Sequence, residues 1–206
     1  MEYACVIQTL EGKTGTASVL SKRRATTELP IEVTLAYALP KGDKVELVAQ
    51  KATELGLHDL WLFASKRSVA KWDDKKAPKK IERLQKIMQE AAEQSYRAIV
   101  PRCAHKTFAD VTRQLDTFDA VVIAYEETAK SGEMAAFARV LSTLKPDAKL
   151  LLLVGPEGGF AEEEIAEWTS RGAICAAFGP RILRTETAPL YALSAVSYAL
   201  ELNVTS

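Results

Sequence analysis

Two glycine-containing loops, each directly after an apolar run, constrain the fold of this chain most. Residues 148–154 read AKLLLLV and residues 173–178 read AICAAF, and uninterrupted apolar runs are typical of strands buried on both faces. The first run leads into GPEGGF and the second into GPRILRTETA. Because parallel strands of an open α/β sheet bind ligands beyond their carboxyl ends, the pattern predicts a ligand site at this edge of a sheet.

The first glycine loop, residues 155–159, differs from loops that bind phosphate. Its spacing matches neither GxGxxG nor GxxxxGK[ST]. Three glutamates follow at positions 162–164, at the start of an expected helix, where their charges suit the positive end of the helix and would repel a pyrophosphate. We therefore expect a neutral or cationic ligand held by backbone groups. Stabilisation of their own helix by itself also explains the three glutamates.

Strands and helices alternate along most of the chain, which predicts a parallel sheet flanked by helices. We expect strands at residues 32–39, 60–64, 99–104, 120–125, 148–154 and 173–178, and helices at residues 44–56, 79–95, 108–115, 134–144, 161–171 and 188–202. Residues 1–30 differ, because two short strands at residues 3–9 and 16–20 flank a turn at Glu11 and Gly12. The expected organisation is a small β segment, residues 1–30, followed by an α/β domain, residues 31–206.

Composition excludes several classes of protein. The three cysteines, Cys5, Cys103 and Cys175, are isolated and lack CxxC spacing, and the chain has two histidines, so we expect neither a disulfide framework nor a metal site. The N-terminal residues do not resemble a signal peptide, and no apolar run has the length of a membrane span. We expect a cytoplasmic protein with no membrane segment.

A basic segment stands out from a chain whose net charge is +0. Residues 66–86 contain nine lysines and arginines against three acidic residues. Phosphate neutralisation supplies much of the affinity of proteins for RNA, and an exposed indole such as that of Trp72 can stack on a base. The segment therefore predicts RNA contacts through Arg67, Lys71 and Trp72, although a solvated loop and helix face would have the same composition.

Several motifs, taken in order, resemble a known family. The two loop motifs are preceded by ALPKGDK at residues 38–44, QKATELG at 50–56, SKRSV at 65–69 and EAAEQSYR at 90–97. Together they resemble the SPOUT, or trefoil-knot, RNA methyltransferases, and within that class the family that methylates N3 of a uridine in 16S ribosomal RNA. This resemblance, and not the periodicity, implies that the last third of the chain forms a trefoil knot. Arg97, which ends the last motif, joins the expected RNA-binding residues.

The resemblance implies that S-adenosylmethionine is the methyl donor. A sulfonium cation suits a pocket that is lined by backbone groups and lacks anion-binding side chains. By position, we expect one wall at the end of the strand at residues 120–125, a close approach of the first glycine loop to the cofactor, and an adenine enclosed by the second loop. The expected cofactor-binding residues are Tyr125, Gly155, Pro156, Glu157, Gly158, Phe178, Gly179, Ile182 and Leu183. Each apolar member is, by itself, also explained as part of the core.

The acceptor atom sets the catalytic problem. N3 of uridine carries a proton at neutral pH, and if its pKa lies about two units above the working pH, ionisation costs about 2.7 kcal/mol. We expect Arg184 to stabilise the developing charge or to hold a phosphate, and Glu157 and Glu186 to be candidate bases. Alternatively, these three side chains pair with one another and brace the loop. Thr185 and Thr187 fit capping of the final helix.

The partners follow from the same resemblance. They are ribosomal RNA, within the small ribosomal subunit, and a second copy of the chain, since the helix at residues 188–202 is apolar around most of its circumference. The family's N-terminal PUA-like barrel is represented here only in part, which predicts weaker RNA binding unless residues 1–30 are a natural short appendage. The alternatives are a SPOUT methyltransferase that acts on another RNA, a non-catalytic RNA-binding protein and a nucleotide-dependent oxidoreductase.

Overall fold

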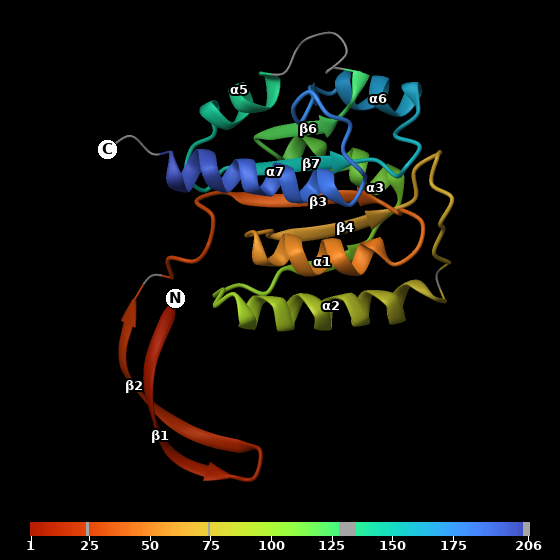
Figure 1. The fold of residues 1–206 in the computed structure, drawn as a ribbon. Coiled ribbons are helices and arrows are strands. Elements are labelled where there is room, and N and C mark those ends of the chain that lie inside the picture. The colour runs from red at the N-terminus through yellow and green to blue at the C-terminus, as the bar shows by residue number, and fades with distance from the viewer. Residues whose placement is uncertain (24, 74, 128–134, 204–206) are drawn as a thin grey trace.

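The computed structural model describes residues 1–23, 25–73, 75–127 and 135–203, and its centre is a parallel sheet (Figure 1). The six strands lie in the order β5-β4-β3-β7-β6-β8 and every neighbouring pair is parallel. This confirms the predicted α/β sheet. The strands are β3 (Glu32–Ala38), β4 (Asp59–Phe63), β5 (Arg102–His105), β6 (Ala120–Ala124), β7 (Lys149–Val154) and β8 (Ile174–Ala176).

Helices cover both faces of the sheet because alternate side chains of each central strand point to opposite faces. In β3, Leu35 and Tyr37 pack in one cluster, whereas Ala36 packs in the other. The first face carries α1 (Lys44–Glu54), α2 (Ala77–Gln94), α5 (Ala136–Thr143) and α7 (Thr187–Ser197), and the second carries α3 (Phe108–Arg113), the 3-10 turn Leu115–Thr117 and α6 (Glu162–Thr169). No helix in the described part of the chain is long and apolar enough to cross a membrane.

The C-terminal part of the chain returns from the edge of the sheet to its centre. Strand β8 is the edge strand next to β6, whereas α7 packs beside α1 and against β7 (Figure 1). The connecting residues therefore run across the carboxyl ends of β6 and β7, in the region for which a knot is expected. A π-helical turn, Tyr198–Leu202, continues α7, so the helical segment ends at the residue predicted for the helix over residues 188–202. Residue 134, the predicted start of α5, lies outside the described residues.

A long β-hairpin stands away from the α/β domain (Figure 1). Strands β1 (Glu2–Glu11) and β2 (Thr14–Arg23) pair in antiparallel register through a turn in which Gly12 has φ +61°, a value that favours glycine. The ladder is longer than the predicted strands because pairing continues to its open end, where Arg23 contacts Glu2 at 2.5 Å. Every side chain from residue 3 to residue 23 is exposed, so the α/β domain does not cover the hairpin.

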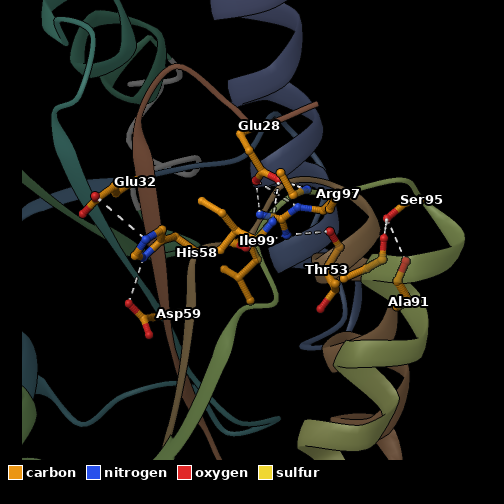
Figure 2. Close-up of polar contacts among 12 residues, drawn as sticks. Glu28, Glu32, Thr53, His58, Asp59, Ala91, Ser95, Arg97 and Ile99 are labelled. Atoms are coloured by element: carbon orange, nitrogen blue, oxygen red, sulfur yellow. Dashed lines mark hydrogen bonds and ion pairs between the residues drawn. The ribbon is translucent and has the colours of Figure 1, made fainter. Parts of the chain in front are cut away.

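An ion pair anchors the segment that follows the hairpin (Figure 2). The Arg97 guanidinium bonds to Glu28 and also donates to the carbonyl oxygens of Thr53 and Leu57, at 2.9 and 2.7 Å. Its side chain is 2 % exposed. The prediction that Arg97 contacts RNA is therefore wrong for this structure, because its N–H groups are used inside the protein. The other carboxylate oxygen of Glu28 accepts from the backbone N–H of Ile99 and its neighbour at residue 98.

Candidate active site

A cavity of about 870 Å³ lies at the carboxyl ends of β6, β7 and β8. Its walls are segments 124–127, 154–160 and 176–185, with Lys44 and Arg67 reaching in from other loops. All nine residues that the sequence assigns to a cofactor pocket line this cavity, and so does Arg184. The structure therefore has a cavity at the edge of the sheet where the sequence predicts the site, while the site itself and the role of each residue stay predictions. Glu186 is not among the lining residues.

The first glycine loop owes its glycines mainly to its own closure. A Cβ atom on Gly155 would lie 3.1 Å from backbone atoms of Gly159, and Gly159 itself has φ +65°. The N–H of Gly159 donates to the carbonyl oxygen of Pro156 at 2.9 Å, which closes the turn. In contrast, a Cβ atom on Gly158 would meet the Arg67 side chain at 3.5 Å, an ordinary contact. The expected reason for these glycines, close approach of a ligand, is thus not required to explain Gly155.

The second loop supplies an apolar wall. Phe178 is buried and its ring packs against Phe137 and Tyr191, with centroids 4.9 and 6.2 Å apart. Ile182 is 71 % exposed, which leaves its side chain available to a ligand. Next to it, the backbone N–H of Tyr125 donates to the carbonyl oxygen of Ala176 at 3.0 Å and so fixes the end of β6 against β8. Core packing therefore fixes the second loop at Phe178, whereas Ile182 is open to solvent.

Thr185 joins the two loops rather than capping the final helix. Its hydroxyl donates to the carbonyl oxygen of Gly155 at 2.7 Å and lies 3.2 Å from the Tyr37 hydroxyl. Because one hydroxyl hydrogen serves only one acceptor, Tyr37 supplies the proton of the second contact. Burial raises the pKa of Tyr37, which keeps the phenol neutral. The predicted capping role is wrong for Thr185, since Glu186 occupies the N-cap position of α7.

Lys44 holds both of the carboxylates that the sequence proposes as bases. Its ammonium lies 2.7 Å from Glu157 Oε1 and 3.3 Å from Glu186 Oε2, and Glu157 also accepts the backbone N–H of Lys41. Burial alone would raise the pKa of Glu157, but the hydrogen bonds from Lys44 and backbone groups lower it below its usual value. The structure therefore does not support a free base at Glu157. Glu186 also contacts the Lys44 ammonium and is not among the lining residues of the cavity.

Arg184 has an exposed side chain at the cavity and, within the described residues, neither an ion pair nor a hydrogen bond of that side chain. The alternative that Arg184 pairs with Glu157 or Glu186 to brace the loop is thus wrong, because Lys44 takes that position. A guanidinium without a protein partner is available to an anionic group of a ligand.

Part of the basic segment lies at the cavity and not on a separate surface. Arg67 donates to the carbonyl oxygen of Gly158 at 3.0 Å. Beside it, the Lys66 ammonium contacts Glu163 at 2.7 Å, and the Lys66 backbone N–H donates to the buried carboxylate of Glu164. Glu164 also accepts the N–H of Ala161 at the start of α6. Two of the three glutamates thus stabilise the helix start and the docked loop, as one of the two interpretations predicts.

Trp72 is packed more tightly than the sequence suggests. Its indole is half-buried against the core, with the His105 ring centroid at 5.9 Å and the Lys80 ammonium 4.8 Å from the ring centroid. Such a ring offers less free surface to a base than an exposed indole would. The prediction of an exposed stacking residue is corrected accordingly, whereas Lys71 is exposed as expected.

Sequence reasoning missed several residues that line the cavity. Lys44 is part of the ALPKGDK motif, but nothing in that motif indicates what its ammonium contacts. The signal for Glu126 and Glu127 was their position directly after β6, at the edge where the site is expected. The charged residues missed are Lys44, Glu126, Glu127, Glu162 and Arg181.

Comparisons with known proteins agree with this geometry. Residues 27–197 match a family model described as "RNA methyltransferase domain". The ribosomal RNA small subunit methyltransferase E of Bacillus subtilis is 48% identical over 202 residues, which cover 98% of this chain and 79% of the relative. The chain belongs to this RNA methyltransferase family. The RNA methyltransferase family and the SPOUT-type sheet predicted from the motifs are thereby confirmed.

Two solved structures resemble this RNA methyltransferase along nearly its whole length. A methyltransferase of Legionella pneumophila in complex with the cofactor SAM has a TM-score of 0.77 and 28% identity, covering 96% of this chain and 78% of that chain. Ribosomal RNA small subunit methyltransferase E of Neisseria gonorrhoeae, bound to S-adenosyl methionine, has a TM-score of 0.75 and 27% identity, covering 95% and 77%. Both proteins were therefore solved with the donor that the motifs imply for this chain.

Proposed function

We propose that this protein transfers the methyl group of S-adenosylmethionine to N3 of a uridine in 16S ribosomal RNA. The observation that supports it best is the cavity between the two loops, which gathers all nine expected cofactor residues. Relatives named ribosomal RNA small subunit methyltransferase E and two similar structures with bound cofactor support the donor and the RNA class. The uridine N3 position rests on the sequence motifs.

The cavity residues fit this cofactor. Four basic side chains (Lys44, Arg67, Arg181, Arg184) and four acidic ones (Glu126, Glu127, Glu157, Glu162) line it, so the cavity has no excess of charge that would exclude a sulfonium cation. Ile182 and Leu183 would contact the adenine, and backbone groups of the second loop would bond its edge. The volume is within the range of about 300–1,000 Å³ for ligand pockets, and at its upper end leaves room for a nucleotide beside the cofactor.

When bound, the donor would supply an activated methyl group. N3 of the uridine would take that methyl group as its N3–H bond breaks, and the products would be S-adenosylhomocysteine and the methylated uridine. Because Lys44 holds Glu157, and Glu186 lies outside the cavity, the proton leaves to water while Arg184 stabilises the negative charge on the uracil. Offsetting an ionisation cost of about 2.7 kcal/mol is within the range of one well-placed cation.

RNA would approach over the exposed basic residues of the segment 66–86, which reaches the cavity through Arg67. Lys71, Lys75 and Lys79 are exposed, and none has a side-chain partner within the described residues. Phosphate contacts of this kind position the RNA without reading its sequence. We propose the small ribosomal subunit, in the cytoplasm, as the setting of the reaction.

A second copy of the chain is the proposed cover for the outer side of the C-terminal helix. Tyr191, Tyr198 and Leu202 are 40%, 61% and 75% exposed, which is unusual for a continuous apolar face. They lie on α7 and its π-helical continuation, on the same face of the sheet as α1. Light scattering at micromolar concentration should give the mass of a dimer.

One experiment tests the function directly. The purified chain is incubated with radiolabelled S-adenosylmethionine and small ribosomal subunits from cells that lack the modification, and the digested RNA is analysed for 3-methyluridine. Label in 3-methyluridine supports the proposal, and label in another nucleoside supports a related methyltransferase with a different target. Binding of S-adenosylhomocysteine without any methyl transfer would instead favour a non-catalytic RNA-binding protein.

A further inference from the structure

One ammonium group lies between carboxylates from the two loops of the cavity. Lys44 is the first residue of α1, Glu157 belongs to the first glycine loop, and Glu186 ends the second loop at the N-cap of α7. The ammonium is 2.7 Å from Glu157 and 3.3 Å from Glu186. Three segments that are distant in sequence therefore meet at a single side chain.

Lys44 supplies the positive charge that lies between the carboxylates of Glu157 and Glu186. Glu186 Oε2 is buried and makes no hydrogen bond, and the ammonium of Lys44 is the cation beside it in the described structure. The contact is thus an ion pair without hydrogen-bond geometry, whereas Glu157 receives the hydrogen bond. Without the cation, the carboxylates of Glu157 and Glu186, which both lie within 3.3 Å of the Lys44 nitrogen, would face each other. Two like charges so close together repel. Removal of Lys44 should separate the loops.

A neutral contact joins the same two loops close by. Thr185, directly before Glu186, donates to the carbonyl oxygen of Gly155, two residues before Glu157. The hydrogen bond holds the loops together at Gly155 and Thr185, and the Lys44 contacts hold them together at Glu157 and Glu186. Both links lie beside the residues that enclose the cavity.

We propose that Lys44 is a positioning residue for methyl transfer: it holds the two loops at the separation at which the cofactor binds, and Glu157 and Glu186 are its counter-ions and not proton acceptors. The inference rests on the proposed function, because it assumes that the cavity takes S-adenosylmethionine. It predicts an effect on cofactor affinity that differs from the effect of losing a base, which would lower kcat and leave affinity intact.

The test compares five variants with the wild-type chain by calorimetry with S-adenosylhomocysteine and by steady-state methyl transfer. Lys44→Met should weaken S-adenosylhomocysteine affinity about tenfold and raise KM for the donor in proportion, and Lys44→Arg should recover most of the loss. Lys41→Met is the charge-matched control, since the Lys41 side chain is exposed and only its backbone bonds Glu157. Its affinity for S-adenosylhomocysteine should stay unchanged.

The remaining two variants separate repulsion from general destabilisation. In Lys44→Met with Glu186→Gln, one of the facing charges is gone, so affinity should recover relative to Lys44→Met alone. Glu157→Gln should raise KM for the donor and largely keep kcat. Unchanged affinity of Lys44→Met, no recovery in the double variant, or loss of kcat at normal donor KM in Glu157→Gln would each overturn the inference. A wild-type chain that does not bind S-adenosylhomocysteine would instead refute the proposed function, and the inference with it.

Discussion

The Thr185 hydroxyl donates to the backbone carbonyl oxygen of Gly155 at 2.7 Å and thereby ties the second loop of the cavity to the first. Thr185 is buried, and the hydroxyl of Tyr37 lies 3.2 Å from its oxygen, so the contact is sealed from water on the side of β3. A buried hydrogen bond between two loops restricts their relative movement more than a bond on the surface would, because water cannot replace either partner.

Replacement of Thr185 by valine keeps the shape of the side chain and removes the hydroxyl. The Tyr37 hydroxyl and the Gly155 carbonyl oxygen then lose a partner in a buried place, which costs about 1–3 kcal/mol. We expect a lower Tm and weaker binding of S-adenosylhomocysteine, measured by calorimetry. Thr185→Ser should keep both near wild-type values. The matched control is Thr187→Val, because Thr187 is exposed and has no side-chain hydrogen bond within the described structure; an equal loss there would contradict the assignment.

Two glycines of the same loop should differ in how replacement by alanine changes cofactor affinity. In Gly155→Ala the new methyl group would lie 3.1 Å from backbone atoms of Gly159, which cannot move without opening the turn. In Gly158→Ala the new group meets only the Arg67 side chain, at 3.5 Å. We expect Gly155→Ala to lose cofactor affinity and Gly158→Ala to stay within about twofold of wild type, a difference of less than about 0.5 kcal/mol. Equal effects in titration calorimetry would show that the loop is not closed in this way.

Arg184→Ala should lower methyl transfer much more than cofactor affinity. Its guanidinium lines the cavity and has no protein partner in the described residues. We therefore expect it to stabilise a negative charge on the RNA, and that charge is largest in the transition state. We expect kcat to fall by on the order of a hundredfold or more with little change in S-adenosylhomocysteine affinity. Arg171→Ala, which removes an exposed arginine at the end of α6, is the control. Proportional loss of affinity and kcat would place Arg184 at the cofactor.

The Arg97–Glu28 pair should matter for stability and not for the cofactor (Figure 2). Arg97→Met leaves the Glu28 carboxylate without its cation, and removing one partner of a buried pair costs about 3–5 kcal/mol. Since Glu28 is 18% exposed, we expect the lower part of that range, read from urea unfolding. Arg97→Met with Glu28→Gln should recover part of it. Cofactor affinity at low temperature should stay unchanged, because the pair lies at the amino ends of the strands, opposite the cavity.

The His58 pair predicts how stability depends on pH. The hydrogen bond to Asp59, at 2.9 Å, raises the pKa of His58 despite partial burial and the nearby Arg102, and Glu32 at 3.8 Å acts in the same direction as Asp59. A folded pKa above the unfolded value means that this stabilisation is fully present below about pH 6.5 and is lost as pH rises through the folded pKa. The Tm difference between wild type and His58→Gln should therefore shrink from about pH 5.5 to about pH 8.5. A difference that grows over this range would contradict the assignment.

The sequence predicted the order of strands and helices closely, with shifts at some boundaries. The hydrophobic pattern is a local property of the sequence and indicates which neighbouring residues are buried. The apolar run at residues 148–154 was therefore recognised, and it forms β7. Strand β5 begins at Arg102 and not at residue 99, because the N–H groups of residues 98 and 99 bond to the Glu28 carboxylate instead of a neighbouring strand. That contact joins positions about seventy residues apart in the chain, which no local pattern indicates.

The sequence by itself determined the parallel sheet and the two loops that line the cavity, since apolar runs followed by glycine loops place those loops at one edge of a sheet. The tertiary structure decided which charges meet there. Lys44 reaches Glu157 across 113 positions, whereas Arg184, close in sequence to Glu186, does not pair with it. An ion pair depends on the spatial distance between two atoms and on their burial, and these follow from packing of the whole domain. The apolar runs and glycine loops therefore predicted where the cavity lies, and the fold determined which charged side chains pair there.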